Sequence, residues 1–262
     1  MRKRRVVLLG ATGSIGESTR KVARDIPERM EIVGMSAHSN LAKLQEAAKD
    51  FPKAKLAVSS GPDGVERLVD LATMPEADMV LIAIVGTGGL RPALAAIEAG
   101  KDIAVASKEI LVMAGEAVMK AARRKGVNVL PVDSEHNAIF QCLENHMAKR
   151  SDTGGKSAET ARDSLSSEVR RLILTASGGP FRTWPAEKLA GVTIEQALKH
   201  PTWNMGAKIT IDSATLFNKG LEMIEARWLF DVEMARVDVI VHPQSIIHSM
   251  VEFIDSSILA QL

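Results

Sequence analysis

The 262-residue chain lacks several features that mark whole classes of protein. It has one cysteine, Cys142, so it cannot form an internal disulfide, which fits a reducing compartment. Its 33 basic and 32 acidic residues leave a net charge of +1, without the basic excess that is typical of nucleic-acid binders. No apolar stretch approaches the roughly 18 residues of a membrane span. We therefore expect a soluble protein with no nucleic-acid or membrane partner, in which any recognition of phosphate is local.

Apolar, β-branched runs alternate with amphipathic segments through the first half of the chain. The expected strands are Val6–Leu9, Ile32–Met35, Met79–Val85, Ile103–Val105 and Val127–Val132, and the expected helices between them are Ile15–Ile26, Leu41–Phe51, Leu90–Ala99 and Ile110–Arg124. This alternation predicts a parallel sheet with helices on both faces. The basic residues before Val6 superficially resemble the start of a signal peptide, but the apolar run that follows them ends at Gly10.

The alternation stops after Val132, so the sequence predicts two domains. Residues 1–132 are expected to form a Rossmann-like domain with a parallel sheet, and residues 133–262 an α+β domain. A polar stretch from Ala148 to Ser167 is expected to be a mobile surface loop within the second domain rather than a linker.

A glycine-rich turn follows the first strand. The segment Gly10-Ala-Thr-Gly13-Ser-Ile-Gly16 opens the next helix, and its glycines would let backbone amides approach a pyrophosphate at the helix N-terminus. The spacing differs from the G-x-G-x-x-G form. Without the strand–turn–helix setting, an ordinary glycine-rich turn would explain it equally well.

The second strand is followed by Ser36-Ala-His38-Ser39-Asn40. An NAD-specific fold places an acidic residue about 20 residues beyond the glycine turn, on the ribose 2′-hydroxyl. No carboxylate stands here to repel a 2′-phosphate, so the segment favours NADPH, although His38 could equally be an ordinary surface histidine.

Two further strands end in polar or small residues, namely Ala83–Gly89 and Ala106-Ser107-Lys108-Glu109. Open α/β sheets bind their ligands at the carboxyl ends of such strands. A functional role for Lys108 is therefore about as well supported as a solvated loop lysine.

The segment Pro131-Val-Asp133-Ser134-Glu135-His136-Asn137 offers carboxylates for a metal. In an extended segment Asp133 and Glu135 would point the same way and supply the oxygen ligands that suit Mg²⁺ or Mn²⁺. A helix N-cap at Asp133 or Ser134 is the stronger reading of these residues alone. A third carboxylate, Glu222, favours the metal site.

The block from His200 to Glu222 is too polar and irregular for ordinary core. It predicts a loop that leads into a helix beginning at about Ala214. On this helix Asn218 and Glu222 share a face, with Lys219 beside them. A surface ion pair is the common alternative. The bulky apolar residues of Trp203–Gly206 favour a flap that closes over a ligand.

A glycine turn at Thr175–Phe181 could offer the Ser177 hydroxyl and backbone amides to a phosphate. Ser213, Asn218 and Lys219 could complete that pocket. Of the later histidines, His242 is expected in the site and His248 at a structural position or an interface.

Taken together, these motifs closely resemble those of the 1-deoxy-D-xylulose 5-phosphate reductoisomerase family. The resemblance covers essentially the whole chain, and the His200–Glu222 block is its most specific part. It implies conversion of 1-deoxy-D-xylulose 5-phosphate to 2-C-methyl-D-erythritol 4-phosphate in non-mevalonate isoprenoid biosynthesis, with NADPH and Mg²⁺ or Mn²⁺. The metal would act as a Lewis acid in a retro-aldol and aldol rearrangement that precedes hydride transfer.

Matched motif by motif, the resemblance implies a role for each residue. The NADPH site would be lined by Thr12, Gly13, Ser14, Ile15, His38, Ser39, Asn40, Ser107, Glu109 and Gly206. The metal would be held by Asp133, Glu135 and Glu222. Substrate would be contacted by Lys108, Ser134, Glu135, Ser177, His200, Trp203, Ser213, Asn218, Lys219 and Glu222. Catalysis would rest on Lys108, Glu135 and His200, under a flap that contains Trp203 and Met205.

The chain departs from the family pattern in two places. Many members have a Gly-Lys pair where this chain has His38-Ser39, and the family continues into a C-terminal helical domain beyond Leu262, which we expect to be absent here. An end within the expected strand Ile258–Leu262 leads us to expect a chain that binds NADPH but aggregates and turns over little. The family resemblance implies a cytoplasmic homodimer, or a plastid location in a plastid-bearing organism.

Two other functions remain open on the sequence. One is another NADPH oxidoreductase, of the semialdehyde or homoserine dehydrogenase type, which would need neither three carboxylates nor a phosphate pocket. The other is a catalytically incompetent binding module.

Overall fold

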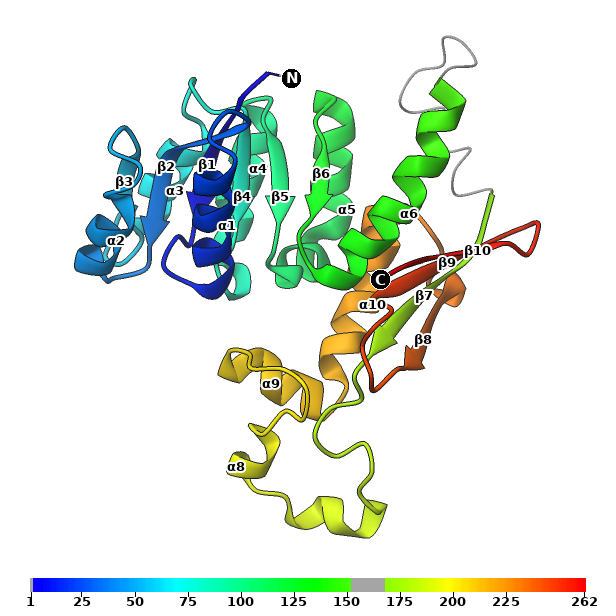
Figure 1. Ribbon diagram of the computed structural model, residues 1–262. Helices are drawn as coiled ribbons and strands as arrows, with labels where there is room; N and C mark the ends of the chain where they lie inside the picture. The colour runs from blue at the N-terminus through cyan, green and yellow to red at the C-terminus, as the bar shows by residue number, and fades with distance from the viewer. Residues whose placement is uncertain (1, 152–167) are drawn as a thin grey trace. The chain divides into compact units, whose positions relative to one another are not determined.

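The computed structural model describes residues 2–151 and 168–262 and divides the chain into two compact units, Met1–Asp133 (unit 1) and Ser134–Leu262 (unit 2) (Figure 1). Among the described residues, no helix combines the length and the apolar character that crossing a bilayer requires.

Unit 1 is built on a six-stranded sheet in the order β3-β2-β1-β4-β5-β6, in which every paired neighbour runs parallel. The strands are β1 (Arg4–Leu9), β2 (Met30–Ala37), β3 (Lys55–Val58), β4 (Met79–Ile82), β5 (Asp102–Val105) and β6 (Val129–Pro131). The helices are α1 (Ser14–Asp25), α2 (Leu41–Ala48), α3 (Gly64–Ala72), α4 (Leu90–Glu98) and α5 (Lys108–Lys125), with the 3-10 turn η1 at Gly86–Gly89. The strand order reverses between β1 and β4, which is where doubly wound sheets bind dinucleotides.

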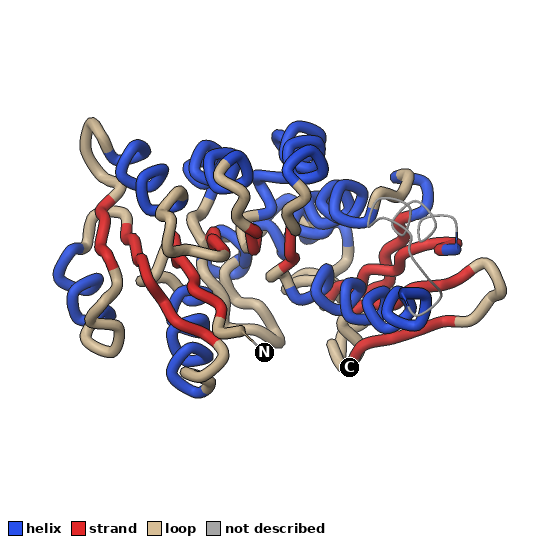
Figure 2. The backbone as a smooth tube through the Cα atoms, turned by 90° about the horizontal axis from the view of Figure 1, so that it is seen from above, coloured by secondary structure: helices blue, strands red, loops and turns tan. Residues whose placement is uncertain are grey.

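Helices lie on both sides of this sheet (Figure 2). The central strand β1 is apolar on both faces, and helices cover both of them, so that Val6 through Leu9 are at most 2% exposed. Ile32 and Met35 of β2 and Leu44 of α2 continue the core on one side. The predicted Rossmann-like fold is confirmed.

The sequence misses one strand–helix pair and misplaces several ends in unit 1. The strand β3 and the helix α3 were not predicted, because β3 is a four-residue edge strand with two exposed side chains and no clear alternation. Helix α2 ends at Ala48 rather than Phe51, since Pro52 disfavours a helical conformation for the residue before it. Strand β4 ends at Ile82, and Val85 beyond it is 77% exposed.

Unit 2 contains a four-stranded sheet in the order β10-β9-β7-β8, with β7 and β8 parallel and the other pairs antiparallel. Its strands are β7 (Val169–Ala176), β8 (Val237–Val241), β9 (Ser249–Phe253) and β10 (Ile258–Gln261). The helices α6 (Ser134–Ser151) and α10 (Phe217–Phe230) supply Ile139 and Ala226 to a core shared with Leu172, Leu174 and Val251 of the sheet. The short segments η2 (Ala186–Gly191), α8 (Ile194–Ala197), α9 (Ala207–Ala214) and η3 (Met234–Arg236) complete the unit.

Two predictions for unit 2 need correction. Helix α6 continues to Ser151, so residues 148–151 are helical rather than a loop, and residues 152–167 lie outside the described residues. The helix predicted from about Ala214 is α10, which begins at Phe217, but the stretch before it, expected to be a loop, contains a further helix, α9. There are two helices, α9 and α10, separated at Leu216, which adopts a left-handed conformation with φ of 60°. Neither glycine nor proline marks this break, so local sequence does not reveal it.

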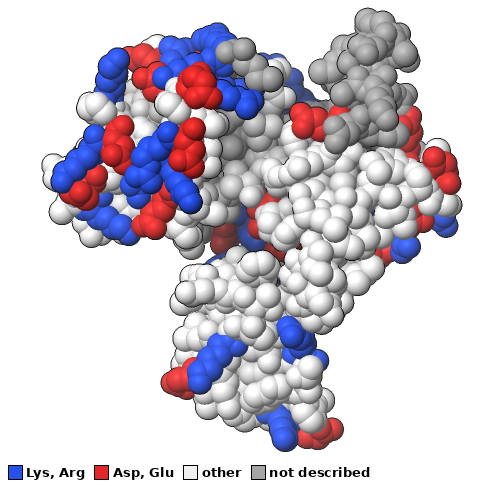
Figure 3. All heavy atoms as spheres, in the orientation of Figure 1, with Lys and Arg blue, Asp and Glu red and all other residues white. Residues whose placement is uncertain are grey.

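Charged side chains of both signs are interspersed over the viewed face of unit 1 (Figure 3). Lys43 pairs with Glu17, Arg24 with Asp50 and Lys49 with Glu46, all at exposed positions.

Candidate functional site

The glycine turn of unit 1 brings backbone amides to the surface at the start of α1. Gly10 has a φ of +95°, and a Cβ at that position would lie 2.3 Å from the Ala83 carbonyl oxygen. A Cβ on Gly16 would lie 2.4 Å from the Gly10 carbonyl oxygen, so only glycine lets α1 pack this closely on the turn. Gly13 is the N-cap residue and makes no side-chain cap. The first N–H groups of α1 are thus available to a pyrophosphate.

Four of the residues predicted on the cofactor belong to this turn and to the start of α1. Thr12 is half-buried in the turn, whereas Gly13, Ser14 and Ile15 are exposed at its end. The Ser36 hydroxyl of β2 accepts a hydrogen bond from the Gly10 N–H at 3.1 Å, which ties β2 to the turn.

His38, Ser39 and Asn40 are exposed at the end of β2. His38 Nδ1 lies 3.3 Å from the Ser59 hydroxyl oxygen. The Asn40 side-chain oxygen accepts from the Lys43 backbone N–H at 2.8 Å and so caps α2. Asn40 therefore has a structural role besides any contact with a cofactor.

Ser107 connects the loop after β5 to the loop after β4, because its hydroxyl donates to the Ile84 carbonyl oxygen. Ser107 is the N-cap residue of α5, and Lys108 and Glu109 form its first turn. Lys108 is not a solvated loop lysine, because its side chain is 8% exposed and its Nζ lies 2.6 Å from Asp133 Oδ2.

In unit 2, a lysine lies between two glutamates. Lys219 Nζ on α10 lies 2.8 Å from Glu135 Oε1 of α6 and also donates to Glu222 Oε2. Burial lowers the pKa of Lys219, but the charges of Glu222 and Glu135 outweigh that effect and raise it overall. Asn218 Nδ2 donates to the other oxygen of Glu222, and the Ser134 hydroxyl donates to Glu135 Oε2 at 2.6 Å.

The carboxylates of Asp133, Glu135 and Glu222 each offer an oxygen, and these oxygens lie within 4.8 Å of one another. Asp133 directly precedes the first residue of α6, so chain connectivity holds it beside Glu135. The prediction that both residues lie on an extended segment is wrong, because Glu135 belongs to the first turn of a helix. Three hard oxygen donors, each of which already pairs with an ammonium, fit a divalent cation such as Mg²⁺.

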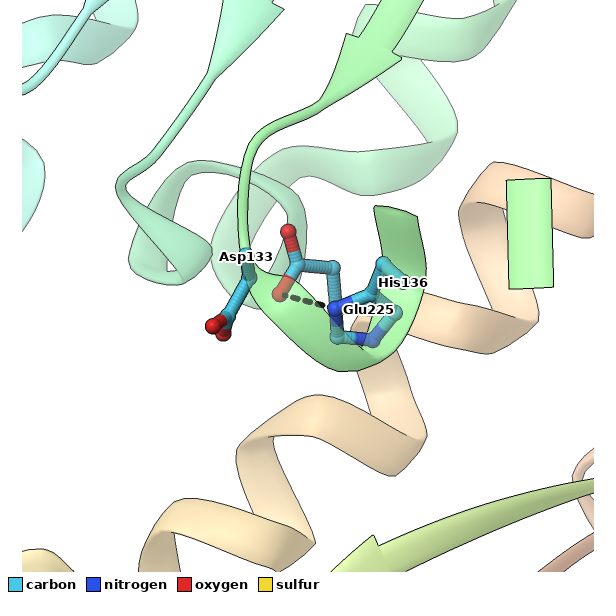
Figure 4. Close-up of side chains that lie close together, drawn as sticks. All are labelled: Asp133, His136 and Glu225. Carbon is cyan, nitrogen blue, oxygen red and sulfur yellow. Dashed lines mark ion pairs between the residues drawn. The ribbon is translucent and has the colours of Figure 1, made fainter. Parts of the chain in front are cut away.

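A buried pair that sequence reasoning missed joins the same two helices. His136 of α6 and Glu225 of α10 are both 0% exposed, with His136 Nδ1 3.4 Å from Glu225 Oε2 (Figure 4). His136 Nε2 donates to the backbone carbonyl oxygen of Glu222 at 2.9 Å, so His136 links Glu135, its neighbour in sequence, to Glu222.

The described residues also offer a second possible cation group, Asp133 with His136 and Glu225. Figure 4 shows the Glu225 carboxylate turned toward the imidazole. The spacing of Glu222 and Glu225, three apart on one helix, is the signal that could have identified Glu225.

A second polar pair in unit 2 joins the glycine turn after β7 to the segment before α9. Ser177 Oγ lies 2.8 Å from His200 Nε2, and His200 Nδ1 accepts from the backbone N–H groups of Thr202 at 3.1 Å and Trp203 at 2.9 Å. Because Nδ1 is an acceptor, Nε2 carries the proton and donates to Ser177. Burial, helped by Arg182, lowers the pKa of His200 and keeps the ring neutral.

The turn that carries Ser177 also lies against the end of α9. A Cβ on Gly179 would be 2.4 Å from the Ser213 carbonyl oxygen, so Ser177 and Ser213 belong to neighbouring segments. In the flap, Trp203 is 45% exposed and Met205 is half-buried. Gly206 caps α9 in unit 2, whereas the other residues predicted on the cofactor lie in unit 1.

His242 has a local structural contact. Its Nε2 accepts from the backbone N–H groups of Ile246 at 3.1 Å and Ile247 at 3.3 Å, so it braces the turn after β8.

Comparison with known proteins identifies the family. Residues 129–230 match the model of the 1-deoxy-D-xylulose 5-phosphate reductoisomerase C-terminal domain, and residues 6–63 and 53–115 match that of 1-deoxy-D-xylulose 5-phosphate reductoisomerase. The enzyme of this name from Protochlamydia amoebophila is 48% identical over 98% of the chain, and that from Anaeromyxobacter sp. (strain K) is 50% identical over 99%. The chain belongs to the 1-deoxy-D-xylulose 5-phosphate reductoisomerase family. It spans 66% of the length of both relatives.

Solved structures of reductoisomerases have the same fold. One in complex with NADPH, fosmidomycin and magnesium superposes with a TM-score of 0.87 at 40% identity, over 99% of this chain and 66% of that one. The Zymomonas mobilis 1-deoxy-D-xylulose 5-phosphate reductoisomerase in complex with NADPH gives a TM-score of 0.80 at 42% identity, over 99% of this chain and 67% of that one.

Proposed function

We propose that the chain carries the NADPH and metal sites of a reductoisomerase that converts 1-deoxy-D-xylulose 5-phosphate to 2-C-methyl-D-erythritol 4-phosphate. The observation that carries this proposal is the carboxylate cluster of Asp133, Glu135 and Glu222, with Lys219 held among its oxygens. A semialdehyde or homoserine dehydrogenase would have no use for such a cluster. Support also comes from relatives that bind NADPH and magnesium.

Asp133, Glu135 and Glu222 would hold Mg²⁺ or Mn²⁺. When bound, the cation supplies Lewis acidity, which polarises the carbonyl and hydroxyl oxygens of the substrate. Lys219 donates to two of these carboxylates, those of Glu135 and Glu222. Its ammonium would also bind the substrate phosphate, the contact that the family resemblance implies for Lys219.

The remaining polar residues of unit 2 would bind and enclose the substrate. The neutral His200 would donate to Ser177 and so orient its hydroxyl to donate to a phosphate oxygen, with Ser213 on the neighbouring segment. Asn218 would orient the Glu222 carboxylate that it already contacts. The exposed Trp203 would close over the substrate and exclude water.

In unit 1, the glycine turn and the N-terminus of α1 would hold the pyrophosphate of NADPH, which supplies the hydride. The ammonium of Lys108, buried beside Asp133, would stabilise negative charge that develops on a substrate oxygen. The family relationship also leads us to propose a homodimer in the cytoplasm.

The proposal is tested by following NADPH oxidation by the purified chain with 1-deoxy-D-xylulose 5-phosphate while Mg²⁺ is varied. We expect turnover that requires Mg²⁺, and we expect Glu222→Gln to raise the Mg²⁺ concentration needed for half-maximal rate at least tenfold while NADPH affinity changes little. Glu195→Gln, at an exposed position of α8, is the matched control and should behave like the unmodified chain. NADPH oxidation that is independent of Mg²⁺, or unaltered by Glu222→Gln, would contradict the proposal.

A further inference from the structure

The segment expected at the 2′-phosphate of NADPH carries no fixed positive charge. Ser36 to Asn40 contains no lysine or arginine. A phosphate monoester is close to a dianion at neutral pH, so strong preference for NADPH over NADH calls for a cation nearby.

Lys43 brings such a cation to the site from the neighbouring helix. It lies in the first turn of α2, and its Nζ donates to the Thr12 carbonyl oxygen of the glycine turn at 2.9 Å. The Lys43 side chain therefore spans from the end of β2 to the turn at the start of α1. It is 51% exposed, so a ligand can reach it.

The ammonium of Lys43 has a replaceable partner. Glu17 Oε1 on α1 lies 3.0 Å from Lys43 Nζ, and both side chains are 51% exposed. The hydrogen bond from Lys43 lowers the pKa of Glu17, which is thus ionised at neutral pH. An exposed pair of this kind contributes little to stability, so a phosphate dianion could compete with Glu17 for the lysine.

Two further cations of unit 1 already have partners in the protein. Arg67 donates to the carbonyl oxygens of Val58 and Ser60, at the end of β3. Lys49 pairs with Glu46 at the far end of α2.

We propose that Lys43 determines cofactor specificity by forming an ion pair with the 2′-phosphate of NADPH. A pyrophosphate at the N-terminus of α1 places the adenosine ribose toward the end of β2, between the two segments that Lys43 spans. This inference rests on the proposed NADPH-binding function and deepens it, since it assigns the phosphate to a residue outside the His38–Asn40 segment.

The test compares dissociation constants for NADPH and NADH, measured by fluorescence titration of the full chain. Lys43→Gln should weaken NADPH binding by roughly ten- to hundredfold, the range for a charge-assisted hydrogen bond, and change NADH binding less than about twofold. Lys43→Arg should retain the preference. Lys49→Gln, at the C-cap of the same helix, is the control and should leave both constants unchanged.

A second variant tests the competition with Glu17. Glu17→Gln removes a negative charge and releases the lysine, so NADPH should bind several-fold more tightly and NADH should not. An unmodified chain that binds neither nucleotide would overturn the proposed function and this inference together. Intact NADPH binding with an unchanged NADPH-to-NADH ratio in Lys43→Gln would overturn the assignment of Lys43 alone.

Discussion

Replacing Lys219 with methionine should destabilise the metal-free chain and make its stability depend on Mg²⁺. The Lys219 side chain is 7% exposed, and it holds the carboxylates of Glu222, 1% exposed, and Glu135, 19% exposed. Methionine fills much of the same volume but leaves two close carboxylates without a cation. Removing one member of a buried ion pair costs roughly 3–5 kcal/mol, and the partial exposure of Glu135 places the expected loss near 3 kcal/mol. In a unit of this size that lowers Tm by roughly 10 °C.

The assay is thermal unfolding followed by circular dichroism, in EDTA and in excess Mg²⁺. A divalent cation should replace the missing ammonium, so Mg²⁺ should raise the Tm of Lys219→Met more than that of the unmodified chain. Lys208→Met removes a lysine that is 47% exposed, 2.7 Å from Asp212 on α9, and should cost less than about 0.5 kcal/mol. The reasoning is refuted if Lys219→Met unfolds in EDTA at the same temperature as the unmodified chain, or if Mg²⁺ stabilises both equally.

Three further predictions concern pH and packing. Arg5 holds the pKa of Asp78 at about 2, so this pair stabilises the chain above pH 3.8, and that stabilisation is lost as pH falls toward 2. In urea unfolding at pH 7, Asp78→Asn should be less stable than the unmodified chain by roughly 1–2 kcal/mol, after allowance for solvent screening. The difference in stability should shrink at low pH. The pKa of His200 is lowered from 6.5 in the folded chain, so as pH falls the unfolded chain binds this proton at a higher pH than the folded chain does. The free energy of unfolding should therefore decrease as pH drops below 6.5. In denaturation curves measured over a pH series, His200→Gln should show a smaller decrease. Gly16→Ala places a Cβ 2.4 Å from a backbone oxygen and should abolish measurable NADPH binding in a fluorescence titration, whereas undiminished binding would show that the turn can relax.

The sequence predicts those parts of the fold in which local pattern and burial agree. The strands β1 and β5 contain the apolar runs Val6–Leu9 and Ile103–Val105, and every residue of these runs is buried in the structure. Strand β3 is short and exposed at the sheet edge, so its pattern carries little information. The break at Leu216 between α9 and α10 depends on a left-handed residue without glycine, which tertiary packing imposes.

In the candidate site, too, the sequence predicts contacts within one helix but not contacts between helices. The four-residue spacing of Asn218 and Glu222 predicted a shared helix face, and their side chains are hydrogen-bonded. Contacts between α6 and α10 have no local signal, so neither the His136–Glu225 pair nor the place of Lys219 between Glu135 and Glu222 could be predicted. Residues brought together by tertiary packing become visible only in the structure.

The most direct test of the account is Mn²⁺ binding to the purified chain, measured by electron paramagnetic resonance. We predict a single strong site per chain, and at least tenfold weaker binding in Glu222→Gln under conditions where circular dichroism shows that variant to be folded. Mn²⁺ binding of equal strength in Glu222→Gln and the unmodified chain would contradict the assignment of the metal to Asp133, Glu135 and Glu222.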